Sequence, residues 1–243
     1  MDRTTRILPA RATTAVALLA LAACAPDSDA RSTSTGATAS GDVAHIDTTP
    51  SAPLAANAVR YAVAPSGNVA RYRVREQLMG RDLPNNAVGE TREVSGALAF
   101  DDKGALVPSG SRLTVRTGTF KSDSDRRDGY VRNRLLQSEQ HPTVELAPAA
   151  ARGLPASFAT AGGTAGPVTF DLTGDLTIRG VTKPTTWKVT ARRAGDVVTG
   201  TATTKFTFAD FSITPPKVPI VLSVADTIGL EYDFTLNRDR GTP

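Results

Sequence analysis

The sequence predicts an all-β protein in which about eight antiparallel strands close into a barrel, with one short helix or ordered loop near residues 122–137. From Val59 onward, apolar and polar residues alternate with a period of two, which is typical of strands that bury one face. Turn-forming Gly, Pro and Asp residues separate these runs. Strands with one apolar face must close into a barrel or stack as a sandwich, and long one-sided strands favour the barrel.

The clearest strand spans residues 168–179. One face carries Val168, Phe170, Leu172, Gly174, Leu176 and Ile178, and polar residues occupy the other. Comparable runs cover residues 69–78, 95–100, 112–116, 143–146, 186–191, 201–208 and 228–236. Turns are expected at residues 101–104, 179–184 and 194–196, so most connections are hairpins.

Residues 122–137 interrupt the strand pattern. Ser122 is followed three residues later by Asp125, which resembles a capping box, and Val131 and Leu135 have the i, i+4 spacing of a helix face. Pro142 discourages any continuation of the helix. We expect a short helix or ordered loop that crosses one end of the barrel.

The first residues resemble a bacterial lipoprotein signal peptide. Arg3, Arg6 and Arg11 precede an uncharged apolar run at residues 15–23, about half the length needed to span a bilayer. The run ends in Leu-Ala-Ala-Cys, which resembles a lipobox and makes Cys24 the expected lipid anchor. The alternative is an ordinary signal peptide in which Cys24 is incidental.

Residues 24–58 are rich in Ser, Thr, Ala, Pro and Gly and show no apolar periodicity. They predict a tether that would span roughly 30–35 Å as a flexible coil. The organisation expected is a signal peptide at 1–23, a lipidated Cys and tether at 24–58, and a barrel domain at 59–240. This arrangement predicts an extracytoplasmic protein of the cell envelope, held to the membrane through two or more acyl chains.

Composition argues against several functions. The net charge is +4, and a chain beginning at Cys24 keeps 25 basic and 23 acidic residues, too even a balance to favour nucleic acid. One cysteine excludes an intrachain disulfide. His45 lies in the tether and His141 precedes Pro142 in an expected turn, which leaves little for a metal site.

No motif predicts catalysis. Asp171 and Asp175 lie on the same strand face about 13 Å apart, too far for two carboxylates that act on one bond. The charged cluster at residues 123–128 predicts a solvated loop with internal ion pairs, and a calcium loop is the remote alternative. No hydrolase, phosphate-binding or dinucleotide-binding motif occurs. We expect neither catalytic nor metal-binding residues.

Three stretches resemble the YceI-like family of bacterial lipid-binding or polyisoprenoid-binding proteins. They are residues 125–142, the run LTGDLTIRGVTKP at 172–184, and residues 208–232 with Phe211, Ile213, Pro215 and Asp226. The resemblance implies an extended lipocalin-like barrel with a long apolar pocket that holds an isoprenoid chain. Many relatives carry an acidic residue and a His-Ser pair near their first strands. Here Val63 and Ser66 occupy that region without a His, so no head-group contact is carried over.

The inner face is the candidate ligand site. Ala97, Ala99, Gly174 and Ala202 are expected there as small residues that leave space, and Tyr72, Phe170, Trp187 and Phe234 are expected to point inward. The candidate ligand-binding residues are Tyr72, Leu98, Phe100, Val115, Phe170, Leu172, Leu176, Trp187, Phe206, Phe208, Phe211, Leu230 and Phe234.

These observations predict a membrane-anchored protein that binds an isoprenoid or similar amphiphilic lipid and carries out no catalysis. No cofactor is expected other than such a bound lipid. The alternative is a filled barrel, packed by its own phenylalanines, that acts as an interaction domain in the envelope.

Overall fold

The computed structural model describes residues 57–240. Ten strands make up most of them: β1 (Val59–Val63), β2 (Val69–Leu78), β3 (Asn85–Thr91), β4 (Val94–Phe100), β5 (Arg112–Arg116), β6 (Thr143–Arg152), β7 (Thr164–Ile178), β8 (Val181–Ala194), β9 (Val197–Thr207) and β10 (Val221–Asp239). Two short helices, α1 (Asp125–Tyr130) and α2 (Ala156–Thr160), accompany them, and a π-helical turn, Val131–Leu135, continues α1. The predicted signal peptide, Cys24 and His45 lie outside the described residues.

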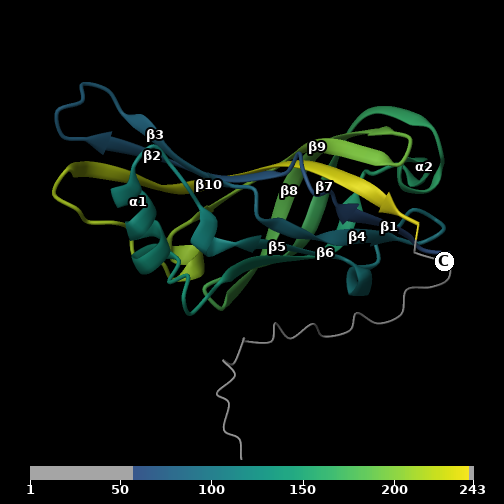
Figure 1. The fold of residues 1–243 in the computed structure, drawn as a ribbon, viewed down its shortest axis with the longest axis horizontal. Coiled ribbons are helices and arrows are strands. Elements are labelled where there is room, and N and C mark those ends of the chain that lie inside the picture. Colours follow the sequence, from purple (N-terminus) through teal and green to yellow (C-terminus); the bar gives the residue numbers. More distant parts are fainter. Residues whose placement is uncertain (1–56, 241–243) are drawn as a thin grey trace, which may run out of the picture. The chain divides into compact units, whose positions relative to one another are not determined.

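The strands form one antiparallel sheet that closes on itself, which confirms the predicted barrel (Figure 1). Both β1 and β2 pair with β10, one after the other, and therefore act as a single interrupted strand. β3 pairs with β2, and β4 with β1, so they make a second interrupted strand. The ten segments thus occupy eight strand positions around the barrel, and the pairing of β1 with β10 closes it.

The tightest hairpin joins β7 to β8. Ile178 pairs with Val181, and the two residues between them, Arg179 and Gly180, both have positive φ, 52° and 75°. This is the geometry of a type I′ turn, whose twist suits a two-residue hairpin. The predicted turn at 179–184 was therefore too long, because residues 181–184 already belong to β8.

The predicted helix is present, but it begins later than the sequence pattern suggested. Ser124 is the N-cap, and its side chain accepts a hydrogen bond from the backbone N–H of Arg127. Ser122 instead donates from its backbone N–H and its hydroxyl to Asp128, at 2.8 and 2.6 Å. Asp128 is buried, so the prediction of a solvated loop was wrong for this residue, although Arg127 does pair internally with Asp123.

Strand parity assigns the inner and outer faces of β4. Leu98 lies opposite the buried Tyr61, which faces the interior, whereas Ala99 lies opposite the outward Arg60. The expectation that Ala97 and Ala99 face the interior was wrong, because they share the outer face. They are buried there nonetheless, beneath the 3-10 turn Pro108–Gly110, and Ser111 donates to and accepts from the Ala99 backbone.

None of the helices within residues 57–240 has the length and apolar character required to cross a bilayer.

Candidate ligand-binding cavity

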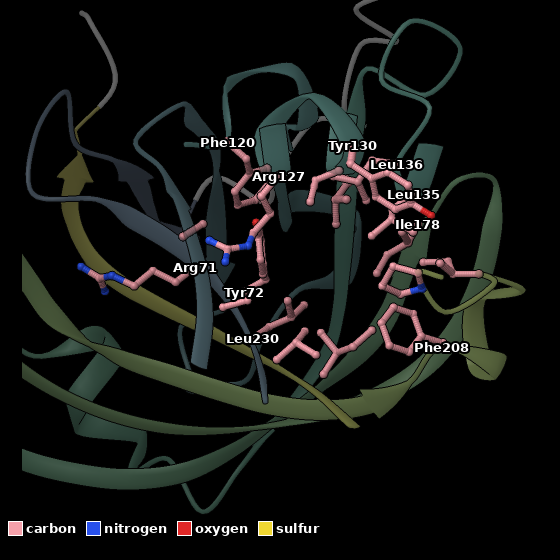
Figure 2. A pocket seen from close by; sticks show the side chains of 18 of the residues that line it. Arg71, Tyr72, Phe120, Arg127, Tyr130, Leu135, Leu136, Ile178, Phe208 and Leu230 are labelled. Carbon is pink, nitrogen blue, oxygen red and sulfur yellow. The ribbon is translucent and has the colours of Figure 1, made fainter. Parts of the chain in front are cut away.

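A cavity of about 1150 Å³ occupies one half of the barrel (Figure 2). Strands β2 to β10, the α1 segment and the loop before β10 all contribute to its wall. Most lining side chains are aliphatic or aromatic, because the inward positions of these strands follow the apolar phase of the alternation. The volume slightly exceeds that of ordinary small-molecule pockets.

The other half of the barrel is filled. A cavity of about 50 Å³ lies there, lined by residues that include Tyr61, Phe158 and Phe234. The buried phenols are satisfied: Tyr61 donates to the carbonyl of Ala159 at 3.0 Å, and Tyr232 donates to the Asn68 side chain at 2.7 Å. Burial raises the pKa of both tyrosines. This half is a packed core that forms the floor of the large cavity.

The predicted ligand-binding residues divide between the two halves. Tyr72, Val115, Leu172, Leu176, Trp187, Phe206, Phe208 and Leu230 line the large cavity. Leu98, Phe100, Phe170 and Phe234 line the small one, and Leu172 lines both. Phe211 lines neither: it sits in the 3-10 turn Ala209–Phe211, outside any strand, and packs edge-on against Phe206 with ring centroids 4.7 Å apart.

Tyr72, Phe170, Trp187 and Phe234 all face the interior, as expected from parity. Ala202 lines both cavities and so lies at their boundary. Gly174 is buried, but the absence of a side chain there is explained by the close approach of the β6 backbone and not by a need for ligand space. A Cβ there would lie 2.5 Å from the carbonyl oxygen of Ala147.

The sequence pattern missed one wall of the cavity. Tyr130, Val131, Leu135 and Leu136 line it from α1 and the turn that follows. The i, i+4 spacing of Val131 and Leu135 was the available signal, but it does not indicate which part of the barrel the segment covers. Residues 218–221 also line the cavity, and their Val-Pro-Ile-Val sequence carries no strand or helix periodicity that would place them.

Charged side chains gather at the α1 end of the cavity. Arg127 lies 2.8 Å from the buried Glu76 on β2 and also pairs with Asp123. Burial alone would lower the pKa of Arg127, but its two carboxylate partners raise it above the ordinary value. Arg127 therefore stays charged and ties α1 to the barrel wall.

Tyr72 places a phenol in the largely apolar wall of the cavity. Its ring lies over Gly89 on β3 and 5.6 Å from the ring of Phe120, centroid to centroid. Burial raises the pKa of Tyr72 to about 12, so its hydroxyl remains protonated. This hydroxyl makes no hydrogen bond within residues 57–240, in contrast to those of Tyr61 and Tyr232. The phenol is thus free to donate to a ligand. Arg71, by contrast, points away from the cavity toward Glu90 and Asp233 (Figure 2).

The remaining candidates for chemistry are dispersed. Asp171 lies 2.7 Å from Lys188 in an ion pair between β7 and β8, and His141 lies beside Gly180 near the β7–β8 turn. Within residues 57–240, no three His, Cys, Asp or Glu side chains are arranged to hold a metal ion. The feature that this part of the chain does show is a large cavity with a mostly apolar wall.

An eight-stranded antiparallel barrel with an apolar interior defines the class of lipocalin-like barrels. Within that class the chain belongs to the YceI-like family, because residues 61–236 match the family model of the YceI-like domain. A UPF0312 protein of Azotobacter vinelandii (strain DJ / ATCC BAA-1303) is 34% identical over 100 residues, which cover 40% of this chain. The match spans 44% of that relative's length, less than half of it.

Solved structures share the fold at low sequence identity. A polyisoprenoid binding domain from Saccharophagus degradans, implicated in plant cell wall breakdown, has a TM-score of 0.56 and 12% identity, covering 74% of this chain and 98% of that one. BcnA of Burkholderia cenocepacia has a TM-score of 0.52 and 17% identity, covering 71% and 98%. The YCEI protein of Campylobacter jejuni has a TM-score of 0.51 and 15% identity, covering 68% and 91%.

Proposed function

We propose that this protein binds a polyisoprenoid or similar amphiphilic lipid without catalysing a reaction on it. The observation that carries the proposal is the apolar cavity of about 1150 Å³. Each buried CH₂ group contributes about 0.8 kcal/mol, so a few isoprene units would give useful affinity without directed polar contacts. The polyisoprenoid binding domain that shares the fold supports the same class of ligand.

The ligand would lie with its chain against the packed floor and its head toward α1. Apolar side chains around Leu172, Leu176 and Trp187 suit a hydrocarbon chain. The phenol of Tyr72 and the charged groups near Arg127 lie where a polar head would need hydrogen bonds. The filled-barrel alternative describes the half around Phe158 and Phe234, and it does not account for the hollow half.

The protein would carry out this role at a membrane of the cell envelope. The lipobox-like sequence that ends at Cys24 and the tether that follows support this placement. A tether of this length would keep the barrel within tens of ångströms of lipid, where an apolar ligand is found.

Native mass spectrometry of the purified protein, with organic extraction of copurifying lipid, tests the proposal. We expect a recurring prenyl species at one molecule per chain. A protein that copurifies with no lipid and takes up neither quinone nor polyprenyl lipid from detergent would contradict it.

A pair of neighbouring substitutions separates cavity filling from loss of stability. Ala202→Trp places a large ring at the cavity boundary, and Thr203→Trp places the same ring on the outer face, because the two residues alternate along β9. We expect Ala202→Trp alone to abolish lipid uptake, with little change in the free energy of unfolding. If it instead costs about 1–3 kcal/mol, the core has no room at this position.

A further inference from the structure

Four large apolar side chains are exposed together at one end of the barrel. Met79 is 60% exposed, Leu83 77%, Ile220 52% and Leu222 61%. Met79 and Leu83 belong to the β2–β3 hairpin, and the other two lie at the start of β10 (Figure 1). The backbone N–H of Met79 donates to the carbonyl of Ile220 at 2.8 Å, so the two segments lie side by side. We call these four residues the apolar tip.

The exposure of the tip follows from backbone geometry. The pairing of β10 with β2 passes from Val221 to Ser223, so Leu222 is the extra residue of a bulge and has no partner in β2. Leu83 precedes Pro84 in a hairpin connection, where no strand covers it. A soluble surface rarely groups large apolar side chains in this way without a partner.

The tip adjoins the mouth of the large cavity. Ile220 belongs to both, since it lines the cavity and is half exposed. Asn133 and Arg134, in the π-helical turn after α1, also line the cavity and are exposed, so the cavity reaches the surface at these residues and at Ile220. An apolar molecule that enters or leaves the cavity would pass beside the tip.

Unpaired cations surround this mouth. Arg81, Arg126, Arg134 and Lys217 are exposed and form no ion pair with residues 57–240. Two exposed carboxylates, Asp82 in the β2–β3 hairpin and Asp226 on β10, are also without an ion pair there, so the unpaired cations outnumber them. Apolar side chains surrounded by cations are complementary to a lipid bilayer with anionic head groups, because the apolar groups can enter the hydrocarbon region while the cations contact the head groups.

We propose that the apolar tip docks on a lipid bilayer that carries anionic head groups and joins the cavity mouth to the bilayer interior. The proposal rests on the proposed function, because it names the route by which the lipid is exchanged. The four tip side chains enter the interface, and the cations meet lipid phosphates. The ligand then crosses between two apolar phases without passing through water.

The tether is long enough for this orientation. The strand that follows it, β1, pairs with residues 236–239 of β10, whereas the tip adjoins Val221 at the other end of β10. Nineteen strand residues span about 60 Å. The 34 residues from 25 to 58 reach about 110 Å when extended, so a lipid on Cys24 and the tip can occupy the same membrane.

A single fluorophore tests the docking. Cys24→Ser in the full chain removes the lipid-attachment site and the only cysteine. Leu83→Cys then places a polarity-sensitive dye on the tip, and Val197→Cys places it on an apolar residue at the opposite end, 38% exposed. The vesicles are an equal mixture of phosphatidylethanolamine and phosphatidylglycerol. We expect a blue shift and quenching by bilayer nitroxides for Leu83→Cys only, weakened by salt or by removal of phosphatidylglycerol.

Equal responses at both positions, or none at Leu83→Cys, would overturn the proposal. A response of Leu83→Cys that depends on protein concentration without vesicles would also overturn it, in favour of a second copy of the chain.

A second variant separates docking from ligand binding. Met79→Ser, Leu83→Ser and Leu222→Ser together remove three tip side chains that do not line the cavity. We expect vesicle binding to fall about tenfold or more and lipid transfer from vesicles to slow in parallel, with uptake from detergent micelles unchanged. Unchanged transfer from vesicles would overturn the docking. An absence of uptake from micelles by the parent chain would instead contradict the proposed function, and the dye on Leu83→Cys would still report docking.

Discussion

Tyr72 lines the large cavity, and its hydroxyl makes no hydrogen bond with residues 57–240. We expect Tyr72→Phe to leave the free energy of unfolding unchanged, because the substitution removes no hydrogen bond between residues 57–240. Binding of a prenyl lipid with a polar head should weaken by about 1 kcal/mol, roughly fivefold, whereas binding of a plain hydrocarbon should not change. Titration of both ligands by tryptophan fluorescence of Trp187 measures the difference.

Tyr232→Phe provides the matched control. Tyr232 lines both cavities, but its hydroxyl donates to Asn68 and is therefore not free to bond to a ligand. Loss of that hydroxyl should cost about 1 kcal/mol of stability and leave lipid binding intact. Equal effects of the two substitutions on binding would show that Tyr72 does not contact the head group.

Single residues were predictable where strand parity governs them. Trp187 and Leu176 face the cavity because they fall on the apolar phase of long strands. Ala97 and Ala99 were misplaced because both phases of β4 are apolar, and only pairing with β1 decides between them. The prediction that Phe211 binds ligand failed for another reason: Phe211 lies in a 3-10 turn, where side chains do not alternate between two faces.

At the scale of elements, Arg127 anchors α1 to β2. We expect Arg127→Met to lower the free energy of unfolding by about 2–4 kcal/mol, because it leaves the buried carboxylate of Glu76 without its cation. Urea denaturation measures the change. Arg126→Met changes the neighbouring exposed arginine and should have almost no effect. The double variant Glu76→Leu with Arg127→Met should recover stability; if it does not, the ion pair is not the cause.

Acid stability depends in part on the contact between β2 and β10. The Arg71 guanidinium holds the pKa of Asp233 below its ordinary value. The unfolded chain takes up a proton at about pH 3.9, whereas the folded Asp233 resists it to lower pH. The stabilisation is therefore fully present above that pH and is lost as pH falls through the folded pKa.

Asp233→Asn should remove this part of the pH dependence. Urea midpoints measured from about pH 6 down to pH 2 should fall less steeply for the variant than for the parent chain. Asp175→Asn changes an exposed aspartate on β7 that has no ion pair within residues 57–240, and should leave the slope unchanged. Parallel curves for Asp233→Asn and the parent would contradict the assignment.

The strands that could be predicted are the long ones in which apolar and polar residues alternate clearly. The eight alternating runs in the sequence correspond to β2 and to β4 through β10. β1 has five residues, and β3 contains Asn, Ala and Gly in place of large apolar side chains, so neither gives a clear periodic signal. Both form because they extend neighbours across the sheet, which is tertiary information.

For the whole molecule, attachment to a membrane is the prediction that rests on residues outside 57–240. Cys24→Ser should abolish incorporation of labelled palmitate and lower the membrane-bound fraction in salt-washed fractions, because the thiol that would carry the lipid is gone. Labelling and fractionation of cells with the parent chain and the variant measure both. Unchanged palmitate incorporation would show that Cys24 is not the anchor.

The seam between β1 and β10 also determines when the protein can fold. Arg60 pairs with Asp239, so the first and last strands of the barrel are neighbours in space. During synthesis no partial chain can close the sheet, and until residues 221–239 emerge, β1, β2 and β9 lack the strand that joins them. Pairing between strands so far apart in the sequence is slow, and unpaired strand edges promote association between nascent chains. Closure of the barrel is therefore a single late event. Until it occurs, the fully synthesised chain exposes unpaired strand edges and must be kept from associating with other chains.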